Sequence, residues 1–331
     1  MANKDTDYLY ISGRVRSLEG KLLNQERMDR MLDAPTPMDA ARVLVECGYP
    51  EVEEVTPSSI NKMLTEQQQK VFEDLSRDAP DQNIVDAFRI KYDYHNAKAL
   101  LKAEVLGIDA DDLMSHAGRV PVEKMQDAIR TSEFTSIPGR LSQGIREARE
   151  VLGNTRDPQQ SDTVLDRAWF EDMMAMADES DSDFLRGYVR LNIDAVNLKS
   201  LVRVMRMGKD ADYLRTVLFP NGNIGEDRIS GLLSSGGQMT DLYATSALKE
   251  AAEAGSAATQ GGSLTQFEKL CDNAIMDYVR KAKYVAFGEA TLVAYLAAKE
   301  SELVAARIIL TGRLAGLSAD TIRERLRESY V

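Results

Sequence analysis

The 331-residue sequence is poor in the residue types that most often carry chemistry. It has two cysteines, two histidines, one tryptophan and only 6% aromatic residues. Cys47 and Cys271 stand far apart with no pairing partner nearby, which favours two free thiols in a reducing compartment. A metal site built on His95 and His116 would need acids supplied by the fold, and neither histidine has a diagnostic spacing. The sequence therefore predicts no metal and no cofactor.

The motifs of common enzyme classes are also missing from the sequence. It contains no GxxxxGK[ST] phosphate loop, no Gly-x-Ser-x-Gly elbow and no Cys-x-x-Cys pair. The stretch "AGSAATQGGS" at 254–263 lacks the lysine of a phosphate loop, and its glycines predict a flexible loop. These absences favour a protein that is not an enzyme.

Charge and hydropathy narrow the range of partners. The formal net charge of −12 argues against a general nucleic-acid binder, because phosphate contacts need a net basic surface. The N-terminal "MANKDTDYLYISGRVRSLEG" lacks the apolar stretch of a signal peptide. No uncharged apolar run approaches the roughly 18–20 residues that span a bilayer. We expect a cytoplasmic protein with no membrane span.

Helical spacing runs through almost the whole sequence. Ala, Leu, Glu and Arg are abundant, prolines number nine, and strand-like alternation is nowhere sustained. This pattern predicts an all-α fold. The expected helices cover 8–32, 58–78, 83–106, 121–131, 139–152, 162–178, 240–253 and 263–282, with two further long helices that end at Gly208 and Gly312.

One helical segment has a near-copy 101 residues further along the chain. "DYHNAKALLKA" at 93–103 matches "DAVNLKSLVRV" at 194–204, and "ELVAARIILTG" at 302–312 is a weaker third copy. The corresponding residues are Asp93, Asp194 and Glu302; Asn96, Asn197 and Ala305; and Lys98, Lys199 and Arg307.

The chain repeats a similar order of helices about every hundred residues, and each repeat ends with the long helix that carries this motif. The repeat predicts three pseudo-equivalent helical units at 1–115, 116–215 and 216–331. The C-terminal "LSADTIRERLRESYV" is similar to the short helix with which a repeat begins. The chain thus ends with the start of another repeat, so we expect the third unit to close back onto the N-terminal helix.

Each copy of the motif presents two chemically different faces. One residue advances about 100° around a helix, which places the acid and the Asn within the apolar stripe and the cations opposite. Two interpretations stay open for the buried pair: it satisfies polar groups of a neighbouring segment, or it contributes acids to a hydrolytic site. The cations form either a solvated face or a surface for an acidic partner. The cations concerned are Lys98, Lys102, Lys199, Arg203, Arg206 and Arg307.

Several segments, in order and at matching spacing, resemble a known family. They are "YLYISGRVRSLEGKLL", "YHNAKALLKAEVLG", "YVRLNIDAVNLKSLVRVMRMG" and "YLAAKESELVAARIILTGRLAGLSADTIRERLRESYV". The chain resembles the C subunit of bacterial and archaeal V/A-type ATP synthases, the counterpart of the d subunit of the eukaryotic vacuolar ATPase, over essentially its full length. Ala305 departs from the Asn that this family usually has in the last long helix, whereas Glu302, Arg307 and Gly312 match.

The resemblance implies a funnel of three helical units with pseudo-threefold symmetry. Such a subunit lies on the cytoplasmic face of the membrane proteolipid ring and receives the foot of the rotor shaft. It is a non-catalytic part of the central stalk, in a complex that links ATP to proton or sodium transport. Two alternatives are a generic helical scaffold for another acidic helical partner, and a helical hydrolase or metal enzyme, for which the sequence shows no convergent acid cluster.

Overall fold

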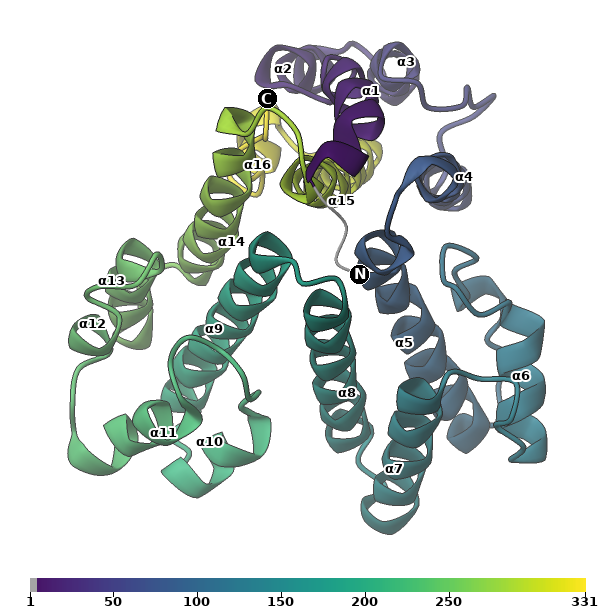
Figure 1. Cartoon of the computed structure of the whole chain (residues 1–331). Helices are drawn as coiled ribbons and strands as arrows, with labels where there is room; N and C mark the ends of the chain where they lie inside the picture. Colours follow the sequence, from purple (N-terminus) through teal and green to yellow (C-terminus); the bar gives the residue numbers. More distant parts are fainter. Residues whose placement is uncertain (1–4) are drawn as a thin grey trace. The chain divides into compact units, whose positions relative to one another are not determined.

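The computed structural model describes residues 5–331, which form helices joined by turns and loops (Figure 1). No strand occurs within this range, so the all-α prediction is confirmed for it. The repeated motif lies on the three longest helices of these residues, which are α5 (Gln82–Leu106), α9 (Asp183–Arg206) and α15 (Glu289–Leu314).

Contacts divide the described chain into two compact units. The first runs from Gln68 to Asp183, and the second combines residues 5–67 with Phe184–Val331. The helix α4 (Pro57–Asp78) contributes residues to both units. The division into three units at 115 and 215 follows the sequence repeat and remains a prediction.

In the first unit, α8 packs against both α5 and α7. Its remaining elements are η2 (Asp111–Leu113), α6 (Val122–Thr131), α7 (Gly139–Thr155) and α8 (Pro158–Glu179). The helices α7 and α8 approach closely because Gly144 has no side chain: a Cβ there would lie 2.9 Å from Cβ of Ala168. Phe88, Leu101 and Leu165 are buried in this unit.

One of the hydrophobic cores in the second unit contains residues from both ends of the chain. Met28 and Leu44, from the N-terminal helices, share this core with Ile309 and Ile322 from the C-terminal ones. The N-terminal elements are η1 (Asp5–Tyr8), α1 (Leu9–Glu19), α2 (Gln25–Asp33) and α3 (Pro37–Glu46). The C-terminal elements are α15 and α16 (Ala319–Arg323).

A second core of this unit surrounds α9. Leu198, Val202, Tyr243 and Phe267 belong to it. Gly255 lets α13 come close to α9, since a Cβ there would lie 2.9 Å from Cγ2 of Val202. The elements are α10 (Ala211–Val217), α11 (Glu226–Ser235), α12 (Met239–Leu242), α13 (Lys249–Thr259), α14 (Leu264–Arg280) and η3 (Lys281–Tyr284).

Three predictions of helix extent are wrong. The helix predicted over 240–253 is divided in two, because α12 ends at Leu242 and α13 begins only at Lys249. The apolar spacing over 8–32 predicted one helix, but α1 ends at Glu19 and Asn24 caps a separate α2 by accepting the N–H of Arg27 at 2.9 Å. The "AGSAATQGGS" stretch is not a loop throughout, because α13 continues to Thr259. Its alanines favour the helix, and the turn comes only at Gly261, whose φ is +100°.

The three long helices α5, α9 and α15 end in the same backbone conformation. In α15 this ending does not occur at Gly312, where the sequence repeat predicted it. Gly107, Gly208 and Gly316 all have φ between +63° and +71°, so the glycine that ends α15 is Gly316 and not Gly312. The backbone bonds are Ile108 N–H to Ala103 O, Lys209 N–H to Val204 O, and Leu317 N–H to Gly312 O. Each is the six-residue bond of a Schellman ending, which favours glycine at its left-handed position. Gly312 is needed for packing instead, since its Cβ would lie 2.7 Å from Ile322.

Candidate functional site

On α5, the repeated Asp and Asn hold the loop that follows this helix. Both side chains are fully buried, as their place in the apolar stripe predicts. Asp93 Oδ1 accepts the backbone N–H of Val120 at 3.0 Å. Asn96 Nδ2 donates to the Ser115 carbonyl while its Oδ1 accepts the Ser115 N–H, both at 2.8 Å. We call this set of bonds the loop lock.

The same loop lock recurs on α9. Asp194 Oδ1 accepts the N–H of Ile224 at 3.1 Å. Asn197 pairs with both backbone groups of Phe219, donating to its carbonyl and accepting from its N–H, each at 2.8 Å. The two copies therefore use the same atoms of the Asp and the Asn for the same purpose.

A glycine completes each of these loop locks. Gly118 and Gly222 each lie two residues before the backbone N–H that the Asp accepts. A Cβ on Gly118 would lie 2.2 Å from Asp93 Oδ1, and one on Gly222 would lie 2.5 Å from Asp194 Oδ1. The backbone could not approach the carboxylate with a side chain at either position. Sequence reasoning missed these glycines, although both precede an apolar residue by two positions, in Gly-x-Val and Gly-x-Ile.

The third copy uses a longer acid and a segment from the opposite end of the chain. Glu302 Oε2 accepts the N–H of Leu23 at 2.7 Å, and Oε1 accepts the hydroxyl of Tyr49 at 2.6 Å. Lys299 forms a buried ion pair with Glu302, and its ammonium lies 4.4 Å from the centre of the Tyr49 ring. The segment before α2 therefore occupies the role that Val120 and Ile224 have in the other copies.

Ala305 has no side-chain amide, and an asparagine of a different helix holds the C-terminal segment. Asn273 of α14 accepts the N–H of Glu328 at 3.0 Å, and its Nδ2 donates to the Glu328 carboxylate at 3.3 Å. Further along the tail, the hydroxyl of Tyr330 donates to Glu19 on α1 at 3.0 Å. The C-terminal segment is thus held to both α14 and α1.

Burial dominates the electrostatics of the two Asp residues. Burial raises the pKa of Asp93 to about 6, although the Val120 N–H and the Arg119 guanidinium both lower it. Burial also raises the pKa of Asp194, which accepts N–H groups from Asn223 and Ile224. Each carboxylate meets backbone and side-chain donors in its loop lock, an arrangement that fixes a segment of chain.

The predicted cations of α5 form ion pairs with α8. Lys98 Nζ lies 2.5 Å from Asp166, and Lys102 Nζ lies 2.6 Å from Asp162. Burial raises the pKa of Asp166 even though Lys98 lowers it. The two pairs are spaced by one turn on each helix, so the cationic face of α5 is also its contact face with α8.

The cations of α9 are arranged in the same way against α14. Lys199 Nζ lies 2.6 Å from Asp272, and Arg203 lies 2.9 Å from Glu268. On α15, the corresponding Arg307 donates to the side chain of Asn61 on α4.

Five of the six predicted cations thus have a partner within the chain, and Arg206 is exposed at the end of α9. The structure brings these cations to helix contacts; that they also bind another protein stays a prediction. The acid and Asn positions lie on the opposite, buried side of each helix.

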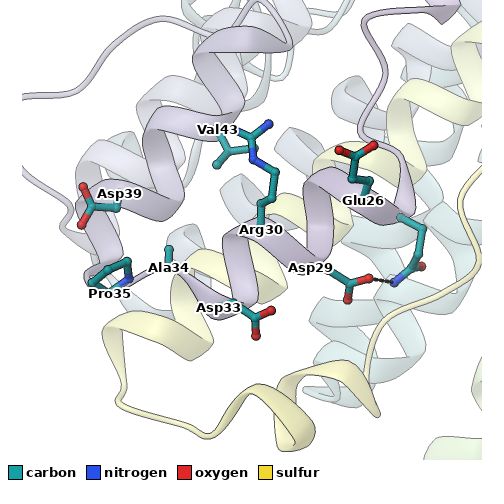
Figure 2. Close-up of a pocket in the computed structure, with 9 residues that line it drawn as sticks. Glu26, Asp29, Arg30, Asp33, Ala34, Pro35, Asp39 and Val43 are labelled. Carbon is teal, nitrogen blue, oxygen red and sulfur yellow. Dashed lines mark hydrogen bonds between the residues drawn. The ribbon is translucent and has the colours of Figure 1, made fainter.

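An acidic groove of about 810 Å³ lies between α2 and α3 (Figure 2). Figure 2 shows four carboxylates around it, from Glu26, Asp29, Asp33 and Asp39. The one cation among its lining residues, Arg30, pairs with Glu46 at 2.6 Å. Sequence reasoning missed this groove, although the acids at 26, 29 and 33 recur at helical spacing and so share one side of α2.

Residues 5–331 hold no group of three or more His, Cys, Asp or Glu side chains that could bind a metal ion. Over the same residues, no helix is both long and apolar enough to cross a membrane. Cys47 and Cys271 are free and buried, and burial raises their thiol pKa values to about 11 and about 12.

Known proteins are similar to this chain over almost its whole length. The family model for the ATP synthase (C/AC39) subunit matches residues 11–325. The chain is 25% identical to the C subunit of the V-type sodium ATPase of Enterococcus hirae, over 98% of this chain and 99% of that protein. It is 24% identical to the C subunit of the A-type ATP synthase of Methanocaldococcus jannaschii, over 96% and 86% of the two chains. The C subunit of the V-type ATP synthase of Thermus thermophilus is 27% identical over 63% of this chain and 67% of its own length.

Proposed function

Because the chain belongs to the ATP synthase (C/AC39) subunit family, we propose that it is the non-catalytic component that couples the rotor shaft to the proteolipid ring of a V/A-type ATPase or ATP synthase. The observation that carries this proposal is the family match over residues 11–325, which leaves only the extreme ends of the chain outside it. Nucleotide chemistry and ion transport then belong to other subunits, with protons or sodium as the transported ion.

The loop locks support a funnel of three related units. Asp93, Asp194 and Glu302 each accept a backbone N–H from a residue two positions before a short helix, which is α6, α11 or α2, respectively. A structure made of three equivalent units, closed by its two chain ends, would repeat such a contact three times. We infer a pseudo-threefold socket that holds the foot of the shaft, with its units fixed to one another by these contacts.

The proposed location is the cytoplasmic face of the cell membrane, as a peripheral part of a membrane complex. Long, well-capped helices suit a part that transmits torque, because a helix resists bending and its ion pairs with neighbouring helices resist sliding. Asp81, Asp157 and Ser263 each cap the first turn of a helix with a side-chain oxygen.

The end of α9 is our proposed contact with an acidic surface of a partner subunit. Arg206 is exposed, and the Arg203 side chain is 62% exposed even with Glu268 beside it. Both belong to the last turn of the helix, so a partner could reach them without disturbing the loop lock on the other side.

Co-expression with the rotor-shaft subunits and the proteolipid ring of the same complex tests this function. The proposal expects the chain to co-purify with both, and failure to associate with either would overturn it. The variant Arg203→Glu plus Arg206→Glu should keep its melting temperature within a few degrees and bind the partner roughly tenfold more weakly.

A matched control makes the same change of charge elsewhere. Lys124 and Arg130 are exposed on α6, and their replacement by Glu should leave binding unchanged. Equal losses in the two variants would show that only net charge matters and would rule out the α9 contact.

A further inference from the structure

The exposed large apolar residues of the first unit lie in one short stretch of sequence. Within Gln68–Asp183 there are four of them, and all lie between positions 105 and 113. They are Val105 at 58% exposure, Leu106 at 68%, Ile108 at 56% and Leu113 at 56%, which we call the α5 apolar edge. Apolar residues scattered singly over a surface need no explanation, but a contiguous set marks an interaction site.

The α5 apolar edge is elongated. After Gly107 the chain folds back along α5, and His95 Nε2 donates to the carbonyl of Leu113 at 3.1 Å. His95 stands eleven residues before Leu106 on the same helix. At 1.5 Å per residue the Leu113 carbonyl therefore lies beside α5 roughly 16 Å before Leu106, so the residues of the edge are spread over a length of about three helical turns.

The surroundings of the edge are acidic. Glu104, Asp109, Asp111 and Asp112 are all exposed beside it. The last turn of α5 contains no basic residue, so the partial negative charge of the helix C-terminus adds to these carboxylates. Glu104 pairs with Arg149 of α7, Asp111 accepts a bond from Gln126, and Asp109 accepts the N–H of Asp111, so Asp112 is the acid best placed to face a partner.

The equivalent ends of α9 and α15 also have exposed acids beyond the glycine, such as Asp212 and Asp320, but they differ in their apolar and basic residues. The end of α9 has Arg203 and Arg206 in its last turn and one exposed large apolar residue, Met207. The end of α15 has Arg313 in its last turn, and its Leu314 and Leu317 are less exposed, at 38% and 37%. Three helices with the same backbone ending thus carry different surfaces, and among them only α5 combines a set of exposed apolar residues with a last turn that has no basic residue.

We propose that the α5 apolar edge docks an amphipathic helix of a partner protein whose apolar stripe is flanked by lysine or arginine. The apolar stripe covers the edge, and the flanking cations face the carboxylates and the negative end of α5. The partner is defined by this chemistry, so the inference does not depend on the coupling role proposed above.

A designed peptide tests the proposal on the full chain. The probe is a fluorescein-labelled amphipathic helix of about 14 residues built from leucine and lysine, and its control has glutamate in place of lysine. Binding is followed by fluorescence anisotropy at low and at raised salt. The leucine–lysine peptide should bind, should bind less tightly at raised salt, and should bind roughly tenfold more tightly than the leucine–glutamate peptide.

Two double variants distinguish binding at the α5 apolar edge from non-specific binding to exposed apolar residues. Leu106→Ser plus Ile108→Ser should weaken the leucine–lysine peptide roughly tenfold, whereas Met207→Ser plus Leu317→Ser, at the ends of the other long helices, should not change it. All four residues are exposed, so circular dichroism and melting should match the wild type. Equal affinities of the two variants would overturn the proposal.

A photo-crosslinker on the peptide gives an independent readout of the same complex. Crosslinks within residues 104–113 would support the docking site. Crosslinks confined to other segments would overturn it, whatever the affinities show.

Discussion

Replacing Asn197 by Ala tests whether the loop lock stabilises the fold. Asn197 is fully buried, and Phe219, whose backbone it holds, is 6% exposed. The substitution removes two hydrogen bonds of 2.8 Å at once, one to the carbonyl and one from the N–H of Phe219. Both backbone groups then lose the hydrogen bond that Asn197 makes to them.

The expected loss of stability follows from those two groups. A buried donor or acceptor that loses its partner costs about 1–3 kcal/mol. Two such groups give a loss of about 2–6 kcal/mol, toward the lower end if a water molecule enters the space that the amide leaves. A domain is stable by only about 5–15 kcal/mol in total, so this single change should be readily measurable.

Asn197→Asp tests the two hydrogen bonds to Phe219 separately, because an ionised aspartate can replace one of them and not the other. Aspartate still accepts the N–H of Phe219, but an ionised carboxylate would face the Phe219 carbonyl, where the amide had donated a bond. The aspartate variant should therefore be less stable than Asn197→Ala at neutral pH. It should recover as the pH falls, because a protonated carboxyl can donate to that carbonyl.

Urea unfolding and hydrogen exchange of the Phe219 amide measure the effect globally and locally. Exchange is needed because a chain with two compact units can unfold in more than one step. Ala305→Asn is a control at the corresponding position of α15, where Asn273 already holds the C-terminal segment, and little gain is expected. The reasoning is refuted if Asn197→Ala loses less than about 0.5 kcal/mol and the Phe219 amide stays protected.

Three further predictions concern pH, packing and thiol reactivity. Because burial raises the pKa of Asp93 from 3.8 to about 6, the folded chain holds this proton more tightly than the unfolded chain, and stability from this group is lost as the pH rises. The free energy of unfolding of the wild type relative to Asp93→Asn, measured in urea, should fall by on the order of 2–3 kcal/mol between about pH 4 and pH 7; a flat difference would contradict it. Gly118→Ala should lower the free energy of unfolding by about 1–3 kcal/mol, and with it the melting temperature. Gly153→Ala, whose new methyl group would lie in open space on α7, should raise the melting temperature slightly. Cys47 and Cys271 should react with iodoacetamide far more slowly in the folded chain than in urea, as followed by mass spectrometry, and equal rates would contradict their burial.

Much of the fold could be predicted from local patterns. The spacing of apolar residues predicted most helices to within a few residues, and it placed Asp93 and Asp194 on the buried side. These features depend on residues three or four apart, which a sequence shows directly. The ending of α15 is different: a glycine shows its role only through its backbone angle, and the left-handed one is Gly316.

The partners of the motif could not be predicted in the same way. Asp93 and Val120 are 27 residues apart, and the segment between α5 and α6 lies between them. The second copy spans 30 residues from Asp194 to Ile224. The basic residues were correctly predicted to share one side of a helix, but the acids that pair with Lys98 and Lys199 lie 68 and 73 residues away.

The third loop lock differs from the other two for a reason of chain connectivity. In the first copy the bond from Val120 to Asp93 closes a loop of 27 residues, whereas the bond from Leu23 to Glu302 spans 279. The entropy lost on closing a flexible loop grows with the logarithm of its length, which makes the longer closure costlier by about 2 kcal/mol.

The additional interactions of the third copy offset that difference. Tyr49 and Lys299 both bind Glu302, and the tail adds the Asn273–Glu328 and Tyr330–Glu19 bonds. A hydrogen bond contributes a net of about 0.5–1.5 kcal/mol, so two or three of them are enough to compensate. The unit whose parts come from opposite ends of the chain therefore needs more side-chain contacts than the units that are continuous in sequence. Truncation before Glu328 should for this reason loosen the packing of α1 and α15 while leaving the loop locks of α5 and α9 protected from hydrogen exchange, and uniform loss of protection would refute it.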